Sequence, residues 1–438
     1  MRFIISILLL LQFSISNNID KFNIERLAYV DSLSNKLIKQ KEFTGVSVLI
    51  NSKDKLIFNK SFGFGEIEKE NNIDDDTIFR IYSMTKPITS IGLMILVERG
   101  LINLYDPISS YLPEFKDMKK IKVIDLPVIK HLFHFTKNVE EPITVFHLLS
   151  HTSGMYYDFS SKYRSVFNKY MKAIDSNPKT LKQYSQEMAK LPLLFEPGED
   201  FSYGINTAIL GRIIEIVSKK PFEDFIEDEI LNPLEMNNTS FNLDSKISNL
   251  PNAYEKKDSQ LIISERLNIT PYNDFKSLNS KKKKISSFNA FPMGGEGLIS
   301  TIKDYSNFCL MLLNNGKYKN KQIISKNTIE LMTQNHIKNL SGINARNVIN
   351  RKSVTAVEDT LKFNFPMDGF GLGFYTNETT INQKSIANNK RYGWFGAANT
   401  FFFIDPMNEF YVIIMAQSYM NIKLLNQYEN VIYQALDN

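Results

Sequence analysis

Apolar residues near both ends of the chain follow the two-residue period of β-strands. VSVLI at 46–50 and LIFNKSFGFG at 56–65 flank a polar turn, which is typical of a β-hairpin. Near the other end, NTFFFIDP at 399–406 and EFYVIIMAQ at 409–417 form a second such pair. Helical periodicity precedes the first pair and follows the second. The pattern predicts that both ends contribute to one antiparallel sheet flanked by helices.

The middle of the chain has a helical period instead. Its segments, separated by Pro and Gly, include ITVFHLLSHTSG, TLKQYSQEMAKLPLL, AILGRIIEIVSKK and FEDFIEDEILNPL. We therefore expect an α/β (α+β) fold, in which residues 105–285 form a mostly helical domain inserted between the two parts of a sheet domain, 17–104 and 286–438. Within the insert, residues 245–285 are polar and lysine-rich, which predicts a long loop.

The first sixteen residues, MRFIISILLLLQFSIS, have the pattern of an export signal. One early positive charge at Arg2 precedes an apolar run and then small residues. The run is shorter than the roughly 20 apolar residues of a membrane span. We therefore expect a signal peptide at 1–16 and an exported protein, periplasmic or secreted, without stable membrane insertion after signal removal. A retained N-terminal anchor is the alternative.

Composition and charge narrow the class of protein. The chain has 438 residues, of which 43% are hydrophobic and 23% charged, as is typical of soluble globular proteins. Its 52 basic and 47 acidic residues nearly balance, and the run Lys281–Lys284 is short, so we expect no nucleic-acid partner. The single cysteine, Cys309, excludes an intrachain disulfide and lies in an apolar helical pattern, which predicts a buried small hydrophobe.

The stretch FRIYSMTKPI, residues 79–88, sets a serine and a lysine one helical turn apart, at Ser83 and Lys86. A serine three residues before a lysine occurs five times in the chain, so the spacing alone indicates little. Ser83 differs from the others because the residues that follow it predict an almost wholly apolar helix over 83–99, which ends at Gly100. Such a helix must be buried.

The predicted helix start suits nucleophilic catalysis. Free N–H groups and the positive dipole end at the first turn stabilise an anion that develops beside Ser83. Side chains at 83 and 86 share one helix face, so a neutral Lys86 there accepts the hydroxyl proton. Burial lowers the pKa of a lysine and thereby favours its neutral form. The alternative is that Ser83 caps the helix and Lys86 extends into solvent.

Two further segments add candidate groups. Tyr203 begins YGIN, in a loop that enters a helix, and its hydroxyl can relay a proton if a cation lowers its pKa. A half-buried aromatic ring is the alternative there. The only tryptophan, Trp394, begins a strand with small residues at Gly396 and Ala397, which allow a substrate to approach a backbone N–H.

Five blocks in this order resemble the serine β-lactamase-related superfamily: FRIYSMTKP, ITVFHLLSHTSGM, FEPGEDFSYGINTAILGRIIE, MGGEGLISTIKDYSNFCLMLLNNG and YGWFGAANTFFFIDP. The resemblance spans about residues 25–435, and its branch holds class C β-lactamases, D-alanyl-D-alanine peptidases and family VIII carboxylesterases. It implies a β-lactamase-like fold with a cleft between a sheet domain and a helical domain. It also implies Ser83 as the acylated nucleophile, Lys86 as its proton partner, Tyr203 as a second acid/base, and the N–H groups of Ser83 and Ala397 as the oxyanion hole.

Departures from the family pattern concern the substrate. Trp394, Phe395 and Gly396 stand where relatives carry Lys-Thr-Gly or a similar triplet, so an aromatic face replaces the lysine that pairs with a penicillin carboxylate. The family's Tyr-x-Asn is one residue longer here, which leaves a substrate-binding role of Asn206 open. Together these changes favour esters over β-lactams.

We therefore predict an exported serine hydrolase that forms an acyl-enzyme on Ser83 and acts on small carboxylic esters, or on amides as a further small-molecule class. A β-lactamase or D-amino-acid peptidase is one alternative, and a catalytically silent cell-wall binding module is another. His147 and His151 have a zinc-compatible spacing on a predicted helix, but neither an HExxH glutamate nor an obvious third ligand accompanies them. We accordingly expect neither a metal nor a cofactor.

Overall fold

The computed structural model describes most of the chain. The described residues are 21–53, 55–124, 133–157, 178–242, 250–268, 291–341, 354–355, 362–363, 367–378 and 390–436. The predicted export signal at 1–16 and the lysine run Lys281–Lys284 lie outside them. Within these ranges, none of the helices has both the length and the apolar character that crossing a membrane requires.

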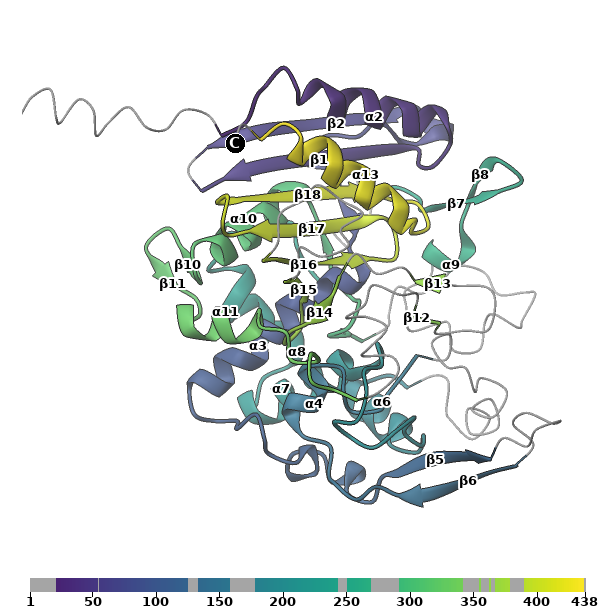
Figure 1. The fold of residues 1–438 in the computed structure, drawn as a ribbon, viewed down its shortest axis with the longest axis vertical. Helices are drawn as coiled ribbons and strands as arrows, with labels where there is room; N and C mark the ends of the chain where they lie inside the picture. The colour runs from purple at the N-terminus through teal and green to yellow at the C-terminus, as the bar shows by residue number, and fades with distance from the viewer. Residues whose placement is uncertain are drawn as a thin grey trace, which may run out of the picture.

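An eight-stranded antiparallel sheet forms the upper part of the molecule in Figure 1, in the order β14-β15-β16-β17-β18-β1-β2-β3. The strands are β1 Gly45–Ser52, β2 Leu56–Glu66, β3 Asn71–Asn72, β14 Gly369–Phe370, β15 Tyr375–Asn377, β16 Arg391–Gly396, β17 Thr400–Asp405 and β18 Phe410–Ala416. Strand β1 pairs with β18, so that Val48 lies opposite Ile414. The prediction that the two ends of the chain share one sheet is confirmed.

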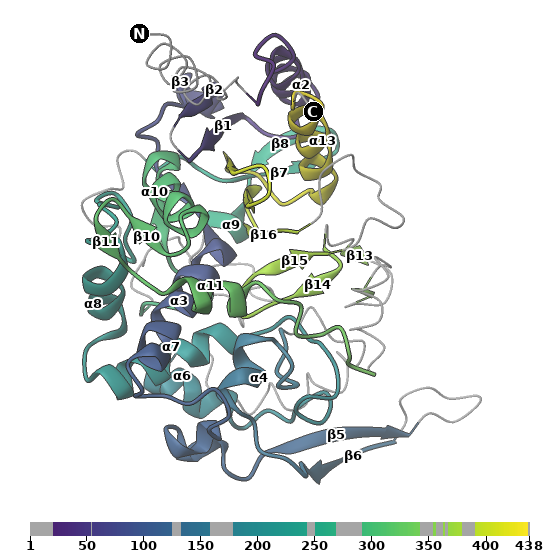
Figure 2. The ribbon, with the colours of Figure 1, turned by 60° about the vertical axis from the view of Figure 1, so that its left-hand side comes forward.

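Helices cover both faces of this sheet (Figures 1 and 2). α2 (Ala28–Lys39) and α13 (Ile422–Tyr433) lie together on one face, and α10 (Ile302–Leu313) lies on the other. Phe402 of β17 contacts Tyr305 of α10 with 5.2 Å between ring centroids, whereas the next residue, Phe403, stacks on Tyr433 of α13 at 5.8 Å. Because neighbouring strand residues point to opposite faces, the FFF run fills both layers.

The helical part of the molecule lies below the sheet in Figure 1. It contains α4 Val145–Leu149, α6 Leu181–Met188, α7 Asn206–Ser218, α8 Phe222–Ile226 and a π-helical turn at Glu227–Leu231. α3 (Thr85–Glu98) runs between this part and the sheet, and all its residues from Thr85 to Leu96 are buried. Gly92 permits this packing, because a Cβ there would lie only 2.8 Å from Ile226 Cδ1 of α8.

Two β-hairpins form within residues 105–285, where the sequence predicted a mostly helical domain with a loop. β5 (Lys119–Ile124) pairs with β6 (Phe133–Asn138), where the sequence alternates polar and apolar residues for only a few positions. β7 (Tyr254–Lys257), β8 (Gln260–Ile263) and α9 (Glu265–Asn268) form inside the predicted loop at 245–285, because Asp258 and Ser259 adopt positive φ angles in a tight hairpin turn. Residues 245–249 and 269–285 of that predicted loop lie outside the described part.

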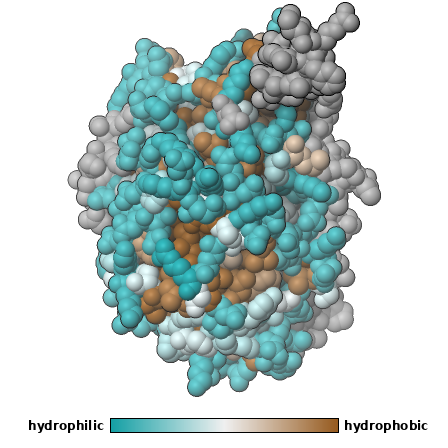
Figure 3. Space-filling model, turned by 90° about the vertical axis from the view of Figure 1, so that its left-hand side faces the viewer, coloured by the Kyte–Doolittle hydropathy of each residue, from teal (hydrophilic) through white to brown (hydrophobic). Residues whose placement is uncertain are grey.

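The α10 side of the molecule is completed by small elements. α11 (Lys326–Met332) and the hairpin of β10 (Lys317–Tyr318) and β11 (Lys321–Gln322) lie beside α10. Figure 3 views the molecule from this side, where most of the surface is hydrophilic and hydrophobic residues gather in the lower central part. Cys309 of α10 is fully buried, as predicted, and burial raises the pKa of its thiol.

Candidate active site

A short strand and a strained turn position Ser83. β4 (Phe79–Arg80) pairs with β9 (Ile299–Ser300), and a 3₁₀ turn over Tyr82–Met84 then leads into α3. Tyr82 has φ +44°, which is unfavourable for a bulky residue, and its hydroxyl donates to the Leu267 carbonyl. Ser83 follows directly at the junction of strand and helix, with its side chain partly exposed.

Lys86 lies beneath Ser83 and is almost fully buried, at 1% exposure. Its Nζ lies 3.1 Å from Ser83 Oγ, 3.2 Å from the Tyr157 hydroxyl and 2.7 Å from the Gly295 carbonyl oxygen. Burial lowers the pKa of Lys86 to about 7, although the nearby Glu296 carboxylate raises it. The lysine therefore does not extend into solvent, and the serine and lysine meet as the first interpretation of the sequence requires.

The three contacts of Lys86 match the bonding capacity of a neutral amine. Such an amine has two N–H donors and one lone pair. When Lys86 is neutral, its two N–H groups donate to the Gly295 carbonyl and the Tyr157 hydroxyl, and its lone pair is left to accept the Ser83 O–H at the third contact. This arrangement prepares the Ser83 proton for transfer to Lys86.

The Tyr203 hydroxyl approaches Ser83 from the other side and donates to its Oγ at 2.7 Å. Lys86 Nζ lies 4.8 Å from the centroid of the Tyr203 ring. Burial nevertheless raises the pKa of Tyr203, and this effect outweighs the hydrogen bonds that lower it. The condition set out from the sequence, a cation that lowers this pKa, is therefore not met, and Tyr203 is a neutral hydrogen-bond donor.

The end of β16 lies against the segment that precedes Ser83. A Cβ at Gly396 would be 2.3 Å from the Ile81 carbonyl oxygen, so only a glycine allows the strand to come this close. Ala397, the next residue, is partly exposed and packs with Tyr82 and Ala398. Ala397 is thus near the Tyr82–Ser83 peptide, where a second N–H donor to an oxyanion is required.

The four predicted substrate-binding residues, Trp394, Phe395, Gly396 and Asn206, are all buried. Trp394 is fully buried and Phe395 is 4% exposed, so the prediction that Trp394 presents an aromatic face to the substrate is wrong. The Trp394 ring packs against the Tyr203 ring, with 5.4 Å between their centroids, because the inward face of β16 contacts the loop that carries Tyr203. Asn206 is also fully buried: its side chain accepts from Ser153 Oγ at 2.5 Å and contacts His151 Nδ1 at 2.9 Å. These bonds hold the loop that carries Tyr203.

Histidines 147 and 151 do not share a helix. α4 ends at Leu149, and His151 has φ +56°, which turns the chain away from helical register. His151 Nδ1 accepts the Gly204 N–H at 3.2 Å, and its ring lies 5.1 Å from that of Tyr203. Across the part of the chain that the structure describes, no cluster of His, Cys, Asp and Glu could hold a metal ion.

Sequence reasoning missed two residues of this site. Tyr157 follows the HTSG segment and contacts Lys86, while burial raises the pKa of its hydroxyl well above its usual value. Glu296, in the MGGEG segment, acts electrostatically on Lys86. A tyrosine and a glutamate in loops carry no pattern of their own. Only their distance in space from Lys86 identifies them.

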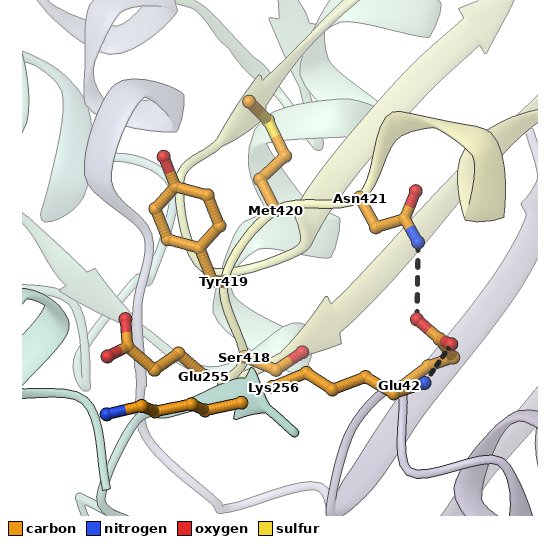
Figure 4. A pocket seen from close by; sticks show the side chains of 8 residues that line it. Glu42, Glu255, Lys256, Ser418, Tyr419, Met420 and Asn421 are labelled. Carbon is orange, nitrogen blue, oxygen red and sulfur yellow. Dashed lines mark hydrogen bonds and ion pairs between the residues drawn. The ribbon is translucent and has the colours of Figure 1, made fainter. Parts of the chain in front are cut away.

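A separate cavity of about 460 Å³ opens near the start of α13 (Figure 4). Its lining residues are Glu42, Glu255, Lys256, Lys257, Ser418, Tyr419, Met420 and Asn421. The Glu42 carboxylate accepts from Lys256 at 2.7 Å and from Asn421 at 3.2 Å, so these charges satisfy one another. None of the candidate catalytic residues lines this cavity, and the candidate site remains the one around Ser83.

Several known proteins have amino-acid sequences similar to that of this chain. Protein Rv1367c of Mycobacterium tuberculosis is 27% identical over 293 residues, which cover 66% of this chain and 67% of the relative. Esterase EstB of Burkholderia gladioli is 25% identical over 216 residues, or 49% of this chain and 51% of EstB. The chain thus aligns with about two thirds of the first relative and half of the second.

Among solved structures, EstCE1, described as a hydrolase with promiscuous acyltransferase activity, has a similar fold. It superposes with a TM-score of 0.73 at 24% identity and covers 94% of this chain and 99% of EstCE1. The Beta-lactamase family model matches residues 30–424, which is most of the chain. The chain therefore belongs to the Beta-lactamase family and is a serine hydrolase with the β-lactamase-like fold.

Proposed function

We propose that this protein is a carboxylesterase that acts through an acyl-enzyme on Ser83. The observation that carries the proposal is the contact of Ser83 Oγ with both Lys86 Nζ at 3.1 Å and the Tyr203 hydroxyl at 2.7 Å. A nucleophile between a buried amine and a phenol has a base for its proton and an acid for the leaving group.

In acylation, Ser83 Oγ attacks the ester carbonyl carbon while its proton passes to neutral Lys86. The N–H groups of Ser83 and Ala397 stabilise the oxyanion of the tetrahedral intermediate. Collapse breaks the ester C–O bond, and the leaving alkoxide takes a proton from Tyr203, which Lys86 reprotonates. Water then attacks the acyl carbonyl and gives its proton to Lys86. The bond to Ser83 Oγ breaks, Tyr203 returns a proton to Ser83, Lys86 reprotonates Tyr203, and the acid product leaves.

Two observations favour esters over β-lactams. The residue where relatives carry a carboxylate-binding lysine is Trp394, which is buried and points no cation at the substrate. EstB, an esterase, is also among the relatives in sequence. Export remains part of the proposal and rests only on the sequence pattern at 1–16.

A panel of substrates tests the proposal. We expect short p-nitrophenyl esters to be turned over with a kcat/KM at least ~100-fold higher than a chromogenic cephalosporin or a D-Ala-D-Ala peptide, because the site lacks the carboxylate-binding lysine. Steady-state rates measured side by side on one preparation give the ratio. Faster hydrolysis of the cephalosporin would contradict the ester assignment.

Tyr203→Phe tests the second acid/base. The variant keeps the ring that packs on Trp394 but removes the hydroxyl bonded to Ser83. We expect kcat to fall by roughly 10²-fold or more, since general acid–base groups contribute about that much. A matched control is Tyr428→Phe, which removes a buried hydroxyl bonded to Ser34 in the α2–α13 layer, 2.9 Å away. Equal rates in the two variants would exclude a chemical role for Tyr203.

A further inference from the structure

The loop that carries Ala397 joins β16 to β17 through three residues. Gly396 pairs with Thr400, so Ala397, Ala398 and Asn399 form the turn of this hairpin. A three-residue hairpin loop commonly ends with a residue in the left-handed region. Asn399 supplies that conformation with φ +56°. A glycine would adopt it at least as easily, so the backbone of the turn does not by itself call for an asparagine.

The Asn399 side chain is 5% exposed and bonds to the chain segment that follows β18. Its Nδ2 donates to Ser418 Oγ at 2.9 Å and to the Tyr419 carbonyl at 3.1 Å. Its Oδ1 accepts from the Asn421 N–H at 2.8 Å. Both N–H groups and the oxygen of the amide are thus bonded, and they tie the loop to three successive parts of one segment.

Backbone groups of the loop bond to the same segment. The Ala397 carbonyl accepts from the Met420 N–H at 2.9 Å, and the Asn399 carbonyl accepts from the Ala416 N–H at 3.2 Å. These two bonds reach opposite ends of the three-residue loop, and the Asn399 side chain adds its three bonds at one of those ends. The loop is therefore held against residues 416–421 along its whole length.

The other side of the loop faces the chain that leads to the nucleophile. Thr400 Oγ1 donates to the Ile81 carbonyl at 3.3 Å, and Ala397 packs against the cluster that contains Tyr82. Ser83 is the next residue. The placement of Ala397 relative to Ser83 therefore depends on how firmly the segment after β18 holds the loop.

We propose that Asn399 is a positioning residue for the oxyanion hole, because its side chain fixes the loop from which the Ala397 N–H acts. The inference rests on the proposed esterase function, in which the N–H groups of Ser83 and Ala397 stabilise the oxyanion. Such a donor is effective only at about 2.7–3.1 Å from the oxyanion, so a small displacement of the loop weakens it.

A p-nitrophenyl ester and its thiono analogue, in which sulfur replaces the carbonyl oxygen, test this inference. Sulfur is a weak hydrogen-bond acceptor, so the oxyanion hole contributes little to the reaction of the thiono ester. The ratio of the two kcat/KM values, divided by the same ratio for hydrolysis by hydroxide, therefore reports on the oxyanion hole. For the unchanged protein we expect the oxygen ester to be favoured at least ~10-fold.

Asn399→Gly keeps the left-handed turn but removes the three side-chain bonds. We expect kcat/KM to fall about tenfold for the oxygen ester and less than about twofold for the thiono ester, so the ratio falls about fivefold or more. Unfolded protein in the sample lowers both rates alike and does not move the ratio. Asn408→Gly is the matched control: it removes an amide bonded to Asp405 at 2.9 Å, in the turn at the other end of β17, and should leave the ratio unchanged.

An unchanged ratio in Asn399→Gly would overturn the inference, whatever happens to stability. Hydrolysis of both esters by the unchanged protein without the expected preference would also overturn it, and would leave Ser83 as the nucleophile. Failure of the unchanged protein to hydrolyse either ester would overturn the proposed esterase function itself. If Asn399→Gly does not fold, Ser418→Ala removes one of the three bonds from the partner side. A ratio about twofold lower in that variant supports the inference, and an unchanged ratio contradicts it.

Discussion

Ser83→Ala is expected to lower kcat for the best ester by roughly four to six orders of magnitude. The substitution removes the only atom that forms the acyl-enzyme, and catalytic groups that act as a unit lose nearly all activity when one is removed. Stability should hardly change, because Ser83 is partly exposed and its backbone is set by Tyr82 and α3. Purified variant and unchanged protein are compared by ester turnover and by thermal unfolding.

A control variant guards against a contaminating esterase. Ser32→Ala removes an exposed hydroxyl from α2, where it bonds only its own helix backbone at Ala28. It should retain full turnover after the same purification. Turnover within a few fold of normal in Ser83→Ala, with none of it removed by further purification, would refute the assigned nucleophile.

Lys86→Met has the second largest expected effect, a loss of roughly 10³-fold or more in kcat/KM, because the serine proton then has no buried acceptor. Met fills a similar volume without a charge. Lys86→Arg is a matched variant that keeps the charge but cannot act as a base, since arginine stays protonated. Both variants should be inactive, and activity in Lys86→Arg would contradict the role of a neutral amine.

The pH dependence follows from the lowered pKa of Lys86. The amine accepts a proton only when neutral, so kcat/KM should rise about tenfold per pH unit below about 7 and level off above it. The folded-state pKa of about 7 lies below the usual 10.5, so between these values the unfolded chain binds a proton that the folded chain lacks. Stability therefore increases with pH over this range. The Tm of the unchanged protein should therefore rise relative to the Tm of Lys86→Met over the same range, because the variant lacks the titrating amine.

Much of the sheet is predictable from sequence because its strands are local patterns. The runs at 46–50 and 399–417 alternate or are largely apolar, and their burial on both faces explains why β1 and β18 are interior strands of the sheet. The hairpin of β7 and β8 escaped prediction because its strands are short and mostly exposed. It forms because Tyr254 is fully buried and anchors it beside β18.

Some residues of the candidate site are likewise predictable from local sequence, and others are not. Ser83 and Lys86 are three residues apart on one chain segment and begin a buried apolar helix, so local sequence reveals them, and the family blocks add Tyr203. Glu296 comes from more than 200 residues further along the chain, and the β4–β9 pairing brings its loop to Lys86, whose Nζ donates to the carbonyl of the preceding residue, Gly295, at 2.7 Å. The orientation of Trp394 was also mistaken, because a strand pattern gives alternation but does not say which face meets the substrate.

Mass spectrometry after treatment with a fluorophosphonate shows whether Ser83 is the nucleophile. We expect one covalent adduct, on the peptide that contains Ser83, at a rate that increases with pH through about 7 as Lys86 becomes neutral. Ser83→Ala should give no adduct, and Tyr428→Phe should react as the unchanged protein does. An unmodified Ser83 after complete inactivation, or an adduct on another residue, would contradict the account.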